Sequence, residues 1–126
     1  MPNIQNPVLI IGGSGVVGAQ AAAAIRRLHP GLPVTIAGRD LGKAQAVAEK
    51  LGVEALTGDL SKPDLGLPES GRFSAIIVFV KDDWSNALRF AQRQGIPHLS
   101  VSSGAFEIGI EAAGFIHQPQ AAPVVL

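Results

Sequence analysis

The segment that most constrains the fold is the apolar run Val8–Ile11, which leads directly into a cluster of glycines and then into an alanine-rich stretch. A buried strand, a tight turn and a helix in this order are typical of the phosphate-binding start of a dinucleotide-binding fold. We expect Gly13 to adopt the backbone angles with which the chain leaves the strand sharply. Gly15 has no Cβ and leaves space for a pyrophosphate, while Gly18 allows the helix to pack closely on the strand.

The start of the expected helix adds a reason to place phosphates at this turn. Its first backbone N–H groups have no partner within the helix, and the positive end of the helix dipole lies there. The alternative is a purely structural strand-to-helix turn without a ligand. The residues predicted to surround the diphosphate are Gly13, Ser14, Gly15, Val16, Val17 and Gly18.

Length and charge limit the classes of protein that need to be considered. With 126 residues, the chain is expected to form one domain, and its formal net charge of zero gives no electrostatic basis for binding nucleic acid or an anionic membrane. The sequence contains no cysteine, which excludes disulfides and thiolate metal sites. No signal peptide and no apolar stretch of about 20 residues is visible, so we expect a cytoplasmic protein.

Strand-like and helix-like segments alternate along the chain. Apolar and β-branched runs predict strands at 8–11, 34–37, 53–56, 74–80 and 98–102. Helical spacing of apolar residues predicts helices at 19–28, 41–51 and 84–94, with a weaker one at 106–116 and a loop at 61–72. In the first helix we expect Ile25 and Leu28 to be buried, and in the third Trp84 is expected to anchor the helix on the sheet rather than stack on a ring.

This alternation predicts an α/β fold with a doubly wound parallel sheet, Rossmann-like, with strand order 3-2-1-4-5 and right-handed crossovers. Ligands of such sheets bind beyond the carboxyl ends of the strands, where the strand order reverses. Gly13, Arg39, Asp59 and Lys81 all follow strand ends, so we expect them to line one crevice.

The apolar run at 122–126 has two interpretations. A run of this kind normally begins an element that continues, which favours the N-terminal part of a longer protein without its substrate domain. The alternative is a short domain whose tail adds an extra C-terminal strand at the sheet edge or meets a partner chain.

Residues after the second strand indicate which dinucleotide is bound. An NAD site usually carries an acidic residue there for the ribose 2′-hydroxyl, whereas this chain has the uncharged Gly38 followed by Arg39. A guanidinium suits a 2′-phosphate, so NADP is predicted and NAD is the less favoured cofactor. Asp40 and Lys43 are both candidate cofactor contacts. Asp40 is interpreted mainly as a helix N-cap, and Lys43 either reaches the phosphate or faces solvent.

Later strand ends supply further candidates. Asp59 either accepts a hydrogen bond from the adenine amino group or simply forms a turn. Phe79, Val80 and Lys81 end the fourth strand, where the nicotinamide side of the crevice is expected to begin. None of the histidines or serines stands in a pattern that identifies a catalytic residue, and the histidines have no metal-ligand spacing.

Together these segments resemble the NADP-binding domain of the saccharopine dehydrogenase-like oxidoreductases. The resemblance rests on the glycine loop and on the segments 37–40, 43–48, 58–60 and 94–103, the third of which adds Leu60 to the cofactor site. It implies a two-part enzyme with a second domain for substrate binding and dimerisation, so a homodimer is one arrangement left open. Atypical short-chain dehydrogenases share the glycine spacing, but the chain has no tyrosine for their Tyr-x-x-x-Lys pair.

Two functional hypotheses follow. In the first, the chain is the cofactor domain of an NADP-dependent oxidoreductase that transfers hydride to or from an unknown small-molecule substrate. In the second, it is a stand-alone nucleotide-binding module, either an NADP(H) sensor or a scaffold, without turnover.

Overall fold

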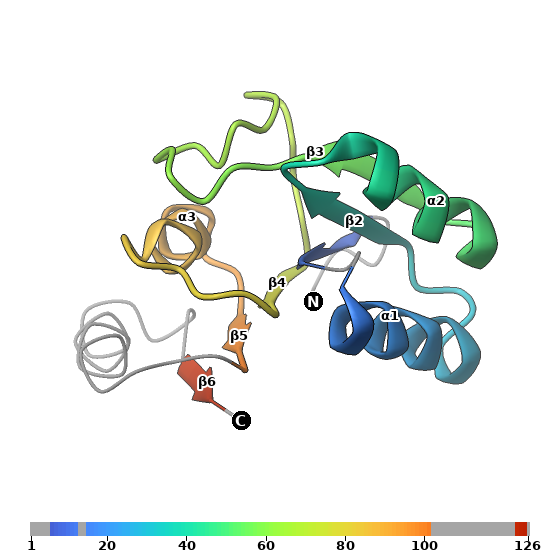
Figure 1. Ribbon diagram of the computed structural model, residues 1–126. Helices are drawn as coiled ribbons and strands as arrows, with labels where there is room; N and C mark the ends of the chain where they lie inside the picture. Colours follow the sequence, from blue (N-terminus) through green and yellow to red (C-terminus); the bar gives the residue numbers. More distant parts are fainter. Residues whose placement is uncertain (1–5, 13–14, 102–122, 126) are drawn as a thin grey trace.

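The computed structural model describes residues 6–12, 15–101 and 123–125, and these form one parallel sheet with helices on both faces (Figure 1). The strands are β1 (Val8–Ile11), β2 (Val34–Gly38), β3 (Glu54–Thr57), β4 (Ala75–Val78), β5 (His98–Ser100) and β6 (Pro123–Val125). The helices of the described segments are α1 (Val16–Leu28), α2 (Leu41–Leu51) and α3 (Asn86–Gln94).

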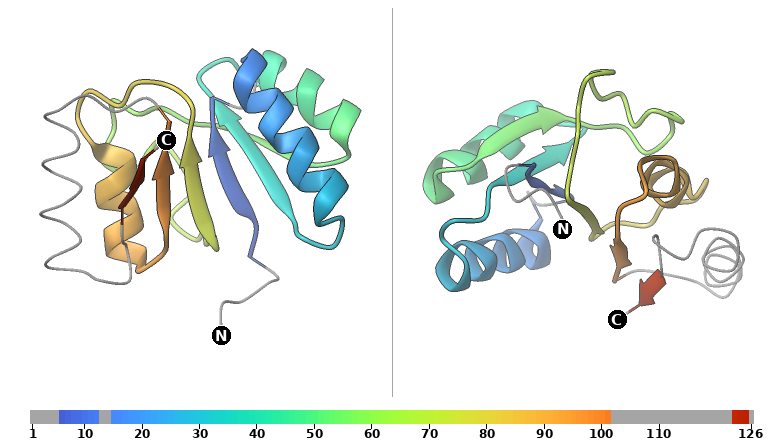
Figure 2. Two further views of the ribbon diagram at one scale, coloured as in Figure 1. Left: turned by 90° about the horizontal axis from the view of Figure 1, so that it is seen from below. Right: turned by 180° about the vertical axis from the view of Figure 1, so that it is seen from behind.

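The strand order is β3-β2-β1-β4-β5-β6, and every neighbouring pair is parallel. This confirms the predicted Rossmann-like fold with its 3-2-1-4-5 order. Residues 123–125 add the extra C-terminal strand, which pairs with β5. Figure 2 (left) shows the carboxyl ends of the strands at one end of the sheet, which is where the expected crevice belongs.

Alternation along the strands divides the core into two layers. Leu9 and Ile11 of β1 pack in a cluster with Ala87 and Ala91 of α3. The intervening residue Ile10 packs on the opposite face, with residues of α1 and α2. Because successive side chains of a strand point to opposite faces, one apolar strand supplies both layers. The sheet is therefore covered on both sides, as the unbroken apolar runs predict.

Local signals in the sequence set the ends of α2 and α3. Asp40 caps α2 by accepting a hydrogen bond from the backbone N–H of Lys43, at 3.2 Å. Gly52 and Gly95 end α2 and α3 in the left-handed conformation, with φ of 66° and 67°. The predicted bounds of α2 agree with the structure, and both glycine stops are confirmed.

Other boundaries differ from the expectation. Helix α1 begins at Val16, three residues early, and its Leu28 is 66% exposed rather than buried. Strand β3 lies one residue later than predicted, while β4 and β5 are shorter. Residues 61–72 form turns, as expected, and the predicted helix at 106–116 lies outside the described residues.

The segment between β3 and β4 is fixed against α3, and this contact positions the site. Its Leu65, Leu67 and Phe73 are buried in the core layer that contains α3. The Asn86 side-chain amide at the start of α3 donates to the carbonyl oxygen of Leu60, at 2.7 Å. The loop after β3 and the beginning of α3 therefore form neighbouring walls.

Candidate functional site

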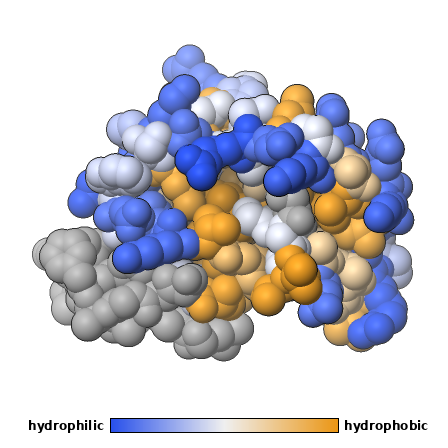
Figure 3. All heavy atoms as spheres, viewed as in Figure 1, coloured by the Kyte–Doolittle hydropathy of each residue, from blue (hydrophilic) through white to orange (hydrophobic). Residues whose placement is uncertain are grey.

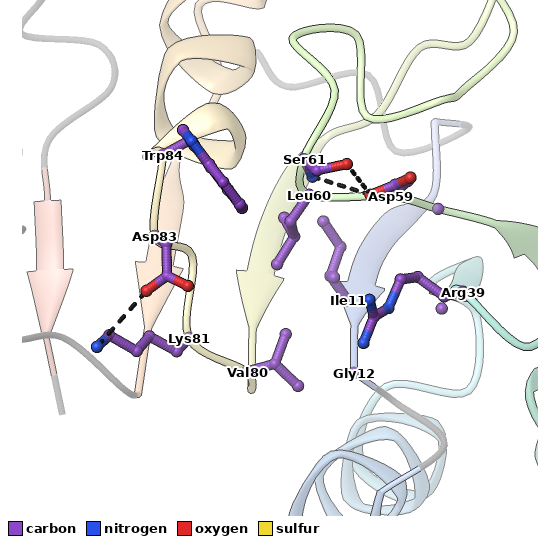
Figure 4. Close-up of a pocket in the computed structure, with 12 residues that line it drawn as sticks. Ile11, Gly12, Arg39, Asp59, Leu60, Ser61, Val80, Lys81, Asp83 and Trp84 are labelled. Carbon is purple, nitrogen blue, oxygen red and sulfur yellow. Dashed lines mark hydrogen bonds and ion pairs between the residues drawn. The ribbon is translucent and has the colours of Figure 1, made fainter.

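A cavity of about 350 Å³ lies at the carboxyl ends of the central strands (Figure 4). Its lining comes from the ends of β1, β2, β3 and β4 and from the segments that follow them. The lining residues are Ile11, Gly12, Gly38, Arg39, Gly58, Asp59, Leu60, Ser61, Val80, Lys81, Asp83 and Trp84. Arg39, Asp59 and Lys81 share this cavity, in agreement with the crevice expected from the strand order.

Gly12 forms the floor where β1 ends, and its position requires glycine. Its φ is +84°, a region that other residues rarely adopt, and a Cβ there would lie 2.9 Å from Cγ1 of Val80. The sequence analysis assigned the sharp exit from the strand to Gly13, which together with Ser14 lies outside the described residues. Among the described residues, the glycine that turns the chain out of β1 is Gly12.

The start of α1, at Val16, follows the cavity floor at Gly12 by four residues. Its N-cap is Gly15, which has no side chain to satisfy the first backbone N–H groups, and the first turn carries no acidic residue. Val16 and Val17 are exposed, and Gly18 is buried, as close packing of helix and strand requires. This helix start has the uncapped amides and the absence of negative charge that suit an anion.

Arg39 and Asp40 have different roles, although they are neighbours in sequence. Arg39 is exposed and lines the cavity beside Gly38. The Asp40 carboxylate is engaged by the Lys43 N–H, so it serves as the N-cap of α2. Neither Asp40 nor Lys43 lines the cavity, although both were predicted to contact the cofactor.

Asp59 forms a turn at the rim of the cavity. Its Oδ1 accepts hydrogen bonds from the Ser61 hydroxyl at 2.6 Å and from the Ser61 backbone N–H at 2.9 Å. These two bonds, the hydroxyl first, hold the pKa of Asp59 below its ordinary value, with smaller contributions from Lys62 and Arg39. The structure therefore gives Asp59 the turn geometry that the sequence analysis considered, with an ionised carboxylate in the cavity wall.

The segment between β4 and α3 builds the opposite wall. Lys81 and Asp83 form an exposed ion pair at 3.5 Å. Between them the buried Asp82 accepts from the backbone N–H groups of Asn86 at 3.2 Å and Ala87 at 2.8 Å, and so fixes the start of α3. Ser85 completes the connection in the left-handed region, with φ of 54°.

Trp84 is not where the sequence predicts it. The helix begins at Asn86, and Trp84 precedes it with 59% of its surface exposed. The anchoring role is taken instead by Ala87, Leu88 and Ala91, which are buried as predicted. Trp84 therefore belongs to the cavity wall, and the expectation that it anchors the helix was wrong.

Phe79 also departs from its predicted place. It packs with the core layer that contains α1 and α2, on the side of the sheet away from α3. The next residue, Val80, lines the cavity and is 42% exposed. Side chains alternate along an extended chain, which explains why Phe79 and Val80 face opposite sides here.

Several cavity residues were missed by the sequence analysis. Ile11 faces the layer of α3, a direction that the alternation along β1 determines. Gly58 lies close to β2, since a Cβ there would be 3.1 Å from Cβ of Ala37. Ser61 could have been found through Asp59, because aspartates commonly bind the residue two positions later in turns. The remaining missed residues are Gly12, Asp83 and Trp84.

The part of the chain that the structure describes contains no cluster of metal-binding type. Within residues 6–12, 15–101 and 123–125, no group of three or more His, Cys, Asp or Glu side chains is arranged to hold a metal ion. Burial lowers the pKa of His98 in β5 to about 4. None of the helices in these segments combines the length and the hydrophobicity that crossing a bilayer requires.

Comparison with known proteins identifies the fold but no family. No family model and no curated protein matches the chain. Among solved structures, it resembles saccharopine dehydrogenase (L-Glu forming) from Saccharomyces cerevisiae, with a TM-score of 0.65 and 22% identity. That match covers 95% of this chain and 26% of the yeast enzyme, so the chain spans about a quarter of that protein's length.

Two further structures have the same architecture. One is a short-chain dehydrogenase/reductase from Vibrio parahaemolyticus, with a TM-score of 0.69 and 13% identity over 94% of this chain and 76% of the other. The second is an alcohol dehydrogenase from Thermococcus sibiricus complexed with 5-hydroxy-NADP, with a TM-score of 0.65 and 16% identity over 94% and 74%. At these identities the matches establish a Rossmann-like fold.

Proposed function

We propose that the cavity binds NADP and that the chain is the cofactor-binding domain of an oxidoreductase. The bound cofactor would supply hydride to, or accept it from, a small-molecule substrate. This domain would bind and orient the dinucleotide across the carboxyl ends of β1, β2 and β4. This is the edge at which doubly wound sheets bind their ligands.

The observation that carries the preference for NADP is the position of Arg39. Its side chain lines the cavity beside Gly38 at the end of β2, where the ribose of an adenosine would lie. A guanidinium binds a phosphate dianion through paired hydrogen bonds. The adjacent Asp40 carboxylate, which would repel that phosphate, is occupied by the Lys43 N–H.

The diphosphate is proposed to lie between Gly12 and the start of α1. Gly12 keeps the floor of the cavity free of a side chain, and Gly15 as the N-cap of α1 offers no side chain to its first amides. No acidic residue in the first turn of α1 opposes a negative charge. A pyrophosphate carries the negative charge that suits such a helix start.

We further propose that a separate domain binds the substrate. The solved yeast enzyme that resembles this chain is about four times longer, which leaves room for such a domain in proteins of this architecture. Two-part dehydrogenases commonly close a second domain over the nicotinamide. Binding without turnover for any substrate, by the full-length protein, would favour a stand-alone nucleotide-binding module instead.

Calorimetric titration of the chain with NADP and with NAD tests the proposal. We expect NADP to bind at least about tenfold more tightly, a difference of about 1.4 kcal/mol. Arg39→Ala should remove most of that difference while leaving NAD binding nearly unchanged. Equal affinities for the two dinucleotides, or tighter NAD binding, would contradict the choice of cofactor.

A matched variant separates a local effect from a general change of charge. Arg27 is an exposed arginine in the last turn of α1 and does not line the cavity. Arg27→Ala removes the same charge elsewhere, so it should keep the preference for NADP. A similar loss of preference in both variants would show that net charge, and not contact with Arg39, sets the selectivity.

A further inference from the structure

Trp84 is the only tryptophan of the chain, and it lies on the wall of the cavity. With 59% of its surface exposed, it contributes little to the core. A large aromatic side chain is usually buried on at least one face, and exposed aromatic groups at a cavity commonly mark a contact with a partner.

Apolar residues share the cavity with Trp84, together with the charged side chains of Arg39, Asp59, Lys81 and Asp83. Ile11, Leu60 and Val80 line the same cavity, and Figure 4 shows the indole directed toward Leu60 and the cavity. Figure 3 shows apolar surface across the middle of this edge of the molecule, with hydrophilic margins around it. An uncharged, flat ring is a chemical group that packs well against apolar side chains of this kind.

The backbone on both sides of Trp84 is fixed. Asp82 holds the start of α3 through two backbone N–H groups, and Asn86 binds the carbonyl oxygen of Leu60 at 2.7 Å. The backbone segment from which the indole projects is therefore held in place, so that segment needs little further ordering when the indole contacts a ligand. Within the described residues, no aromatic side chain stacks on it.

We infer that the Trp84 indole is a stacking platform for the adenine ring of the dinucleotide. The inference rests on the proposed function, since Arg39 places the adenosine 2′-phosphate at one end of the cavity. The base attached to that ribose then lies beside Leu60 and Ser61, the part of the wall toward which Trp84 points. Stacking on an aromatic side chain is a common way for proteins to hold a nucleobase.

The fluorescence of the single tryptophan tests this inference. Adenosine 2′,5′-bisphosphate contains the base and the 2′-phosphate, whereas nicotinamide mononucleotide contains only the other half of the cofactor. We expect the bisphosphate to quench Trp84 saturably, with the affinity measured by calorimetry, and the mononucleotide to leave it unchanged at equal concentration. Quenching by the mononucleotide alone would overturn the assignment of the adenine ring.

Substitutions separate stacking from simple apolar contact. Trp84→Ala and Trp84→Leu should each weaken bisphosphate binding about tenfold, while Trp84→Phe should retain most of the affinity because it keeps an aromatic face. Leu28→Ala is the matched control, an exposed apolar residue at the end of α1 that does not line the cavity. It should bind like the original chain.

The outcomes distinguish this inference from the proposed function. One outcome is that calorimetry detects NADP binding while the tryptophan fluorescence stays unchanged and Trp84→Ala binds equally well. In that case only the stacking role is overturned. If Trp84→Leu binds as tightly as Trp84→Phe, an apolar wall rather than stacking explains the site, and the inference fails. If no dinucleotide binds at all, the proposed function fails and the role of Trp84 fails with it.

Discussion

Asn86 at the start of α3 donates its side-chain amide to the carbonyl oxygen of Leu60, 26 positions earlier in the chain, at 2.7 Å. Asn86 is only 6% exposed, and Leu60 lines the cavity. This hydrogen bond joins the segment after β3 to the segment after β4. One buried side chain thus links the two walls of the cavity directly.

Asn86→Ala should therefore affect both stability and binding. Loss of a buried hydrogen bond that leaves a carbonyl group without its donor costs about 1–2 kcal/mol, which denaturant unfolding measures. Binding of NADP should weaken as well, because the Leu60 wall loses its attachment. Gln94→Ala is the matched control, since Gln94 of α3 donates to the Gly71 carbonyl at 3.0 Å, away from the cavity. It should lower stability without a comparable effect on binding.

Asp82→Asn should destabilise the protein by about 1–2 kcal/mol. The buried carboxylate accepts from two backbone N–H groups with its two oxygens, and an amide offers one acceptor oxygen and no charge. Asp83→Asn removes the same charge at the adjacent position, where the ion pair with Lys81 is exposed. Thermal unfolding should show little change for that variant, since surface ion pairs contribute about 0–1 kcal/mol. Equal losses in both variants would contradict a capping role for Asp82.

Gly12→Ala should destabilise the chain by about 1–2 kcal/mol, because L-residues are disfavoured at its φ of +84°. The new methyl group would also meet Cγ1 of Val80 at 2.9 Å, so a double variant with Val80→Ala should recover part of the loss. Gly31→Ala is the control, because a Cβ at Gly31 has no atom within 4 Å. It should leave the unfolding free energy within about 0.5 kcal/mol.

His98 makes stability depend on pH. Its pKa is lowered by burial from 6.5 to about 4, so the unfolded chain binds a proton more readily than the folded one between these values. Stability should be constant above about pH 6.5 and fall as the pH decreases toward 4. A pKa difference of this size lowers the free energy of unfolding by about 3 kcal/mol between pH 6.5 and pH 4.

His98→Gln tests that dependence through the slope of unfolding free energy against pH, measured in urea from pH 7.5 to pH 4. The slope between pH 6.5 and 4 should decrease strongly, whatever the variant's absolute stability. His29→Gln is the matched control, since it replaces an exposed histidine at the end of α1. An unchanged slope in the His98 variant would show that other groups cause the acid sensitivity.

The sequence predicted best the features that depend on neighbours along the chain. The bounds of α2 followed from Asp40 as its cap and Gly52 as its stop, both of which act within one turn of the helix. The strand order followed from the alternation of strands and helices, since short right-handed crossovers leave few arrangements. Arg39, Asp59 and Lys81 could be placed in one cavity because parallel strands end at one edge.

The wrong predictions concern the direction of side chains near element ends. Phe79 and Val80 were both assigned to the crevice, but the extended backbone sends them to opposite faces. Leu28 and Trp84 were expected to be buried because they are apolar, yet both lie at or just outside a helix terminus and are 66% and 59% exposed. Coverage of that kind depends on the packing of distant segments, which spacing along the chain does not reveal.

The middle of the sheet and its carboxyl edge carry out separate tasks in this protein. Leu9 and Ile10 are fully buried between the helical layers, whereas Arg39 and Lys81 lie on exposed turns that contribute little to those layers. Residues at the turns can therefore be exchanged with small effects on folding. Under the proposed function, a change of ligand preference is accessible through a few surface substitutions on an unaltered scaffold.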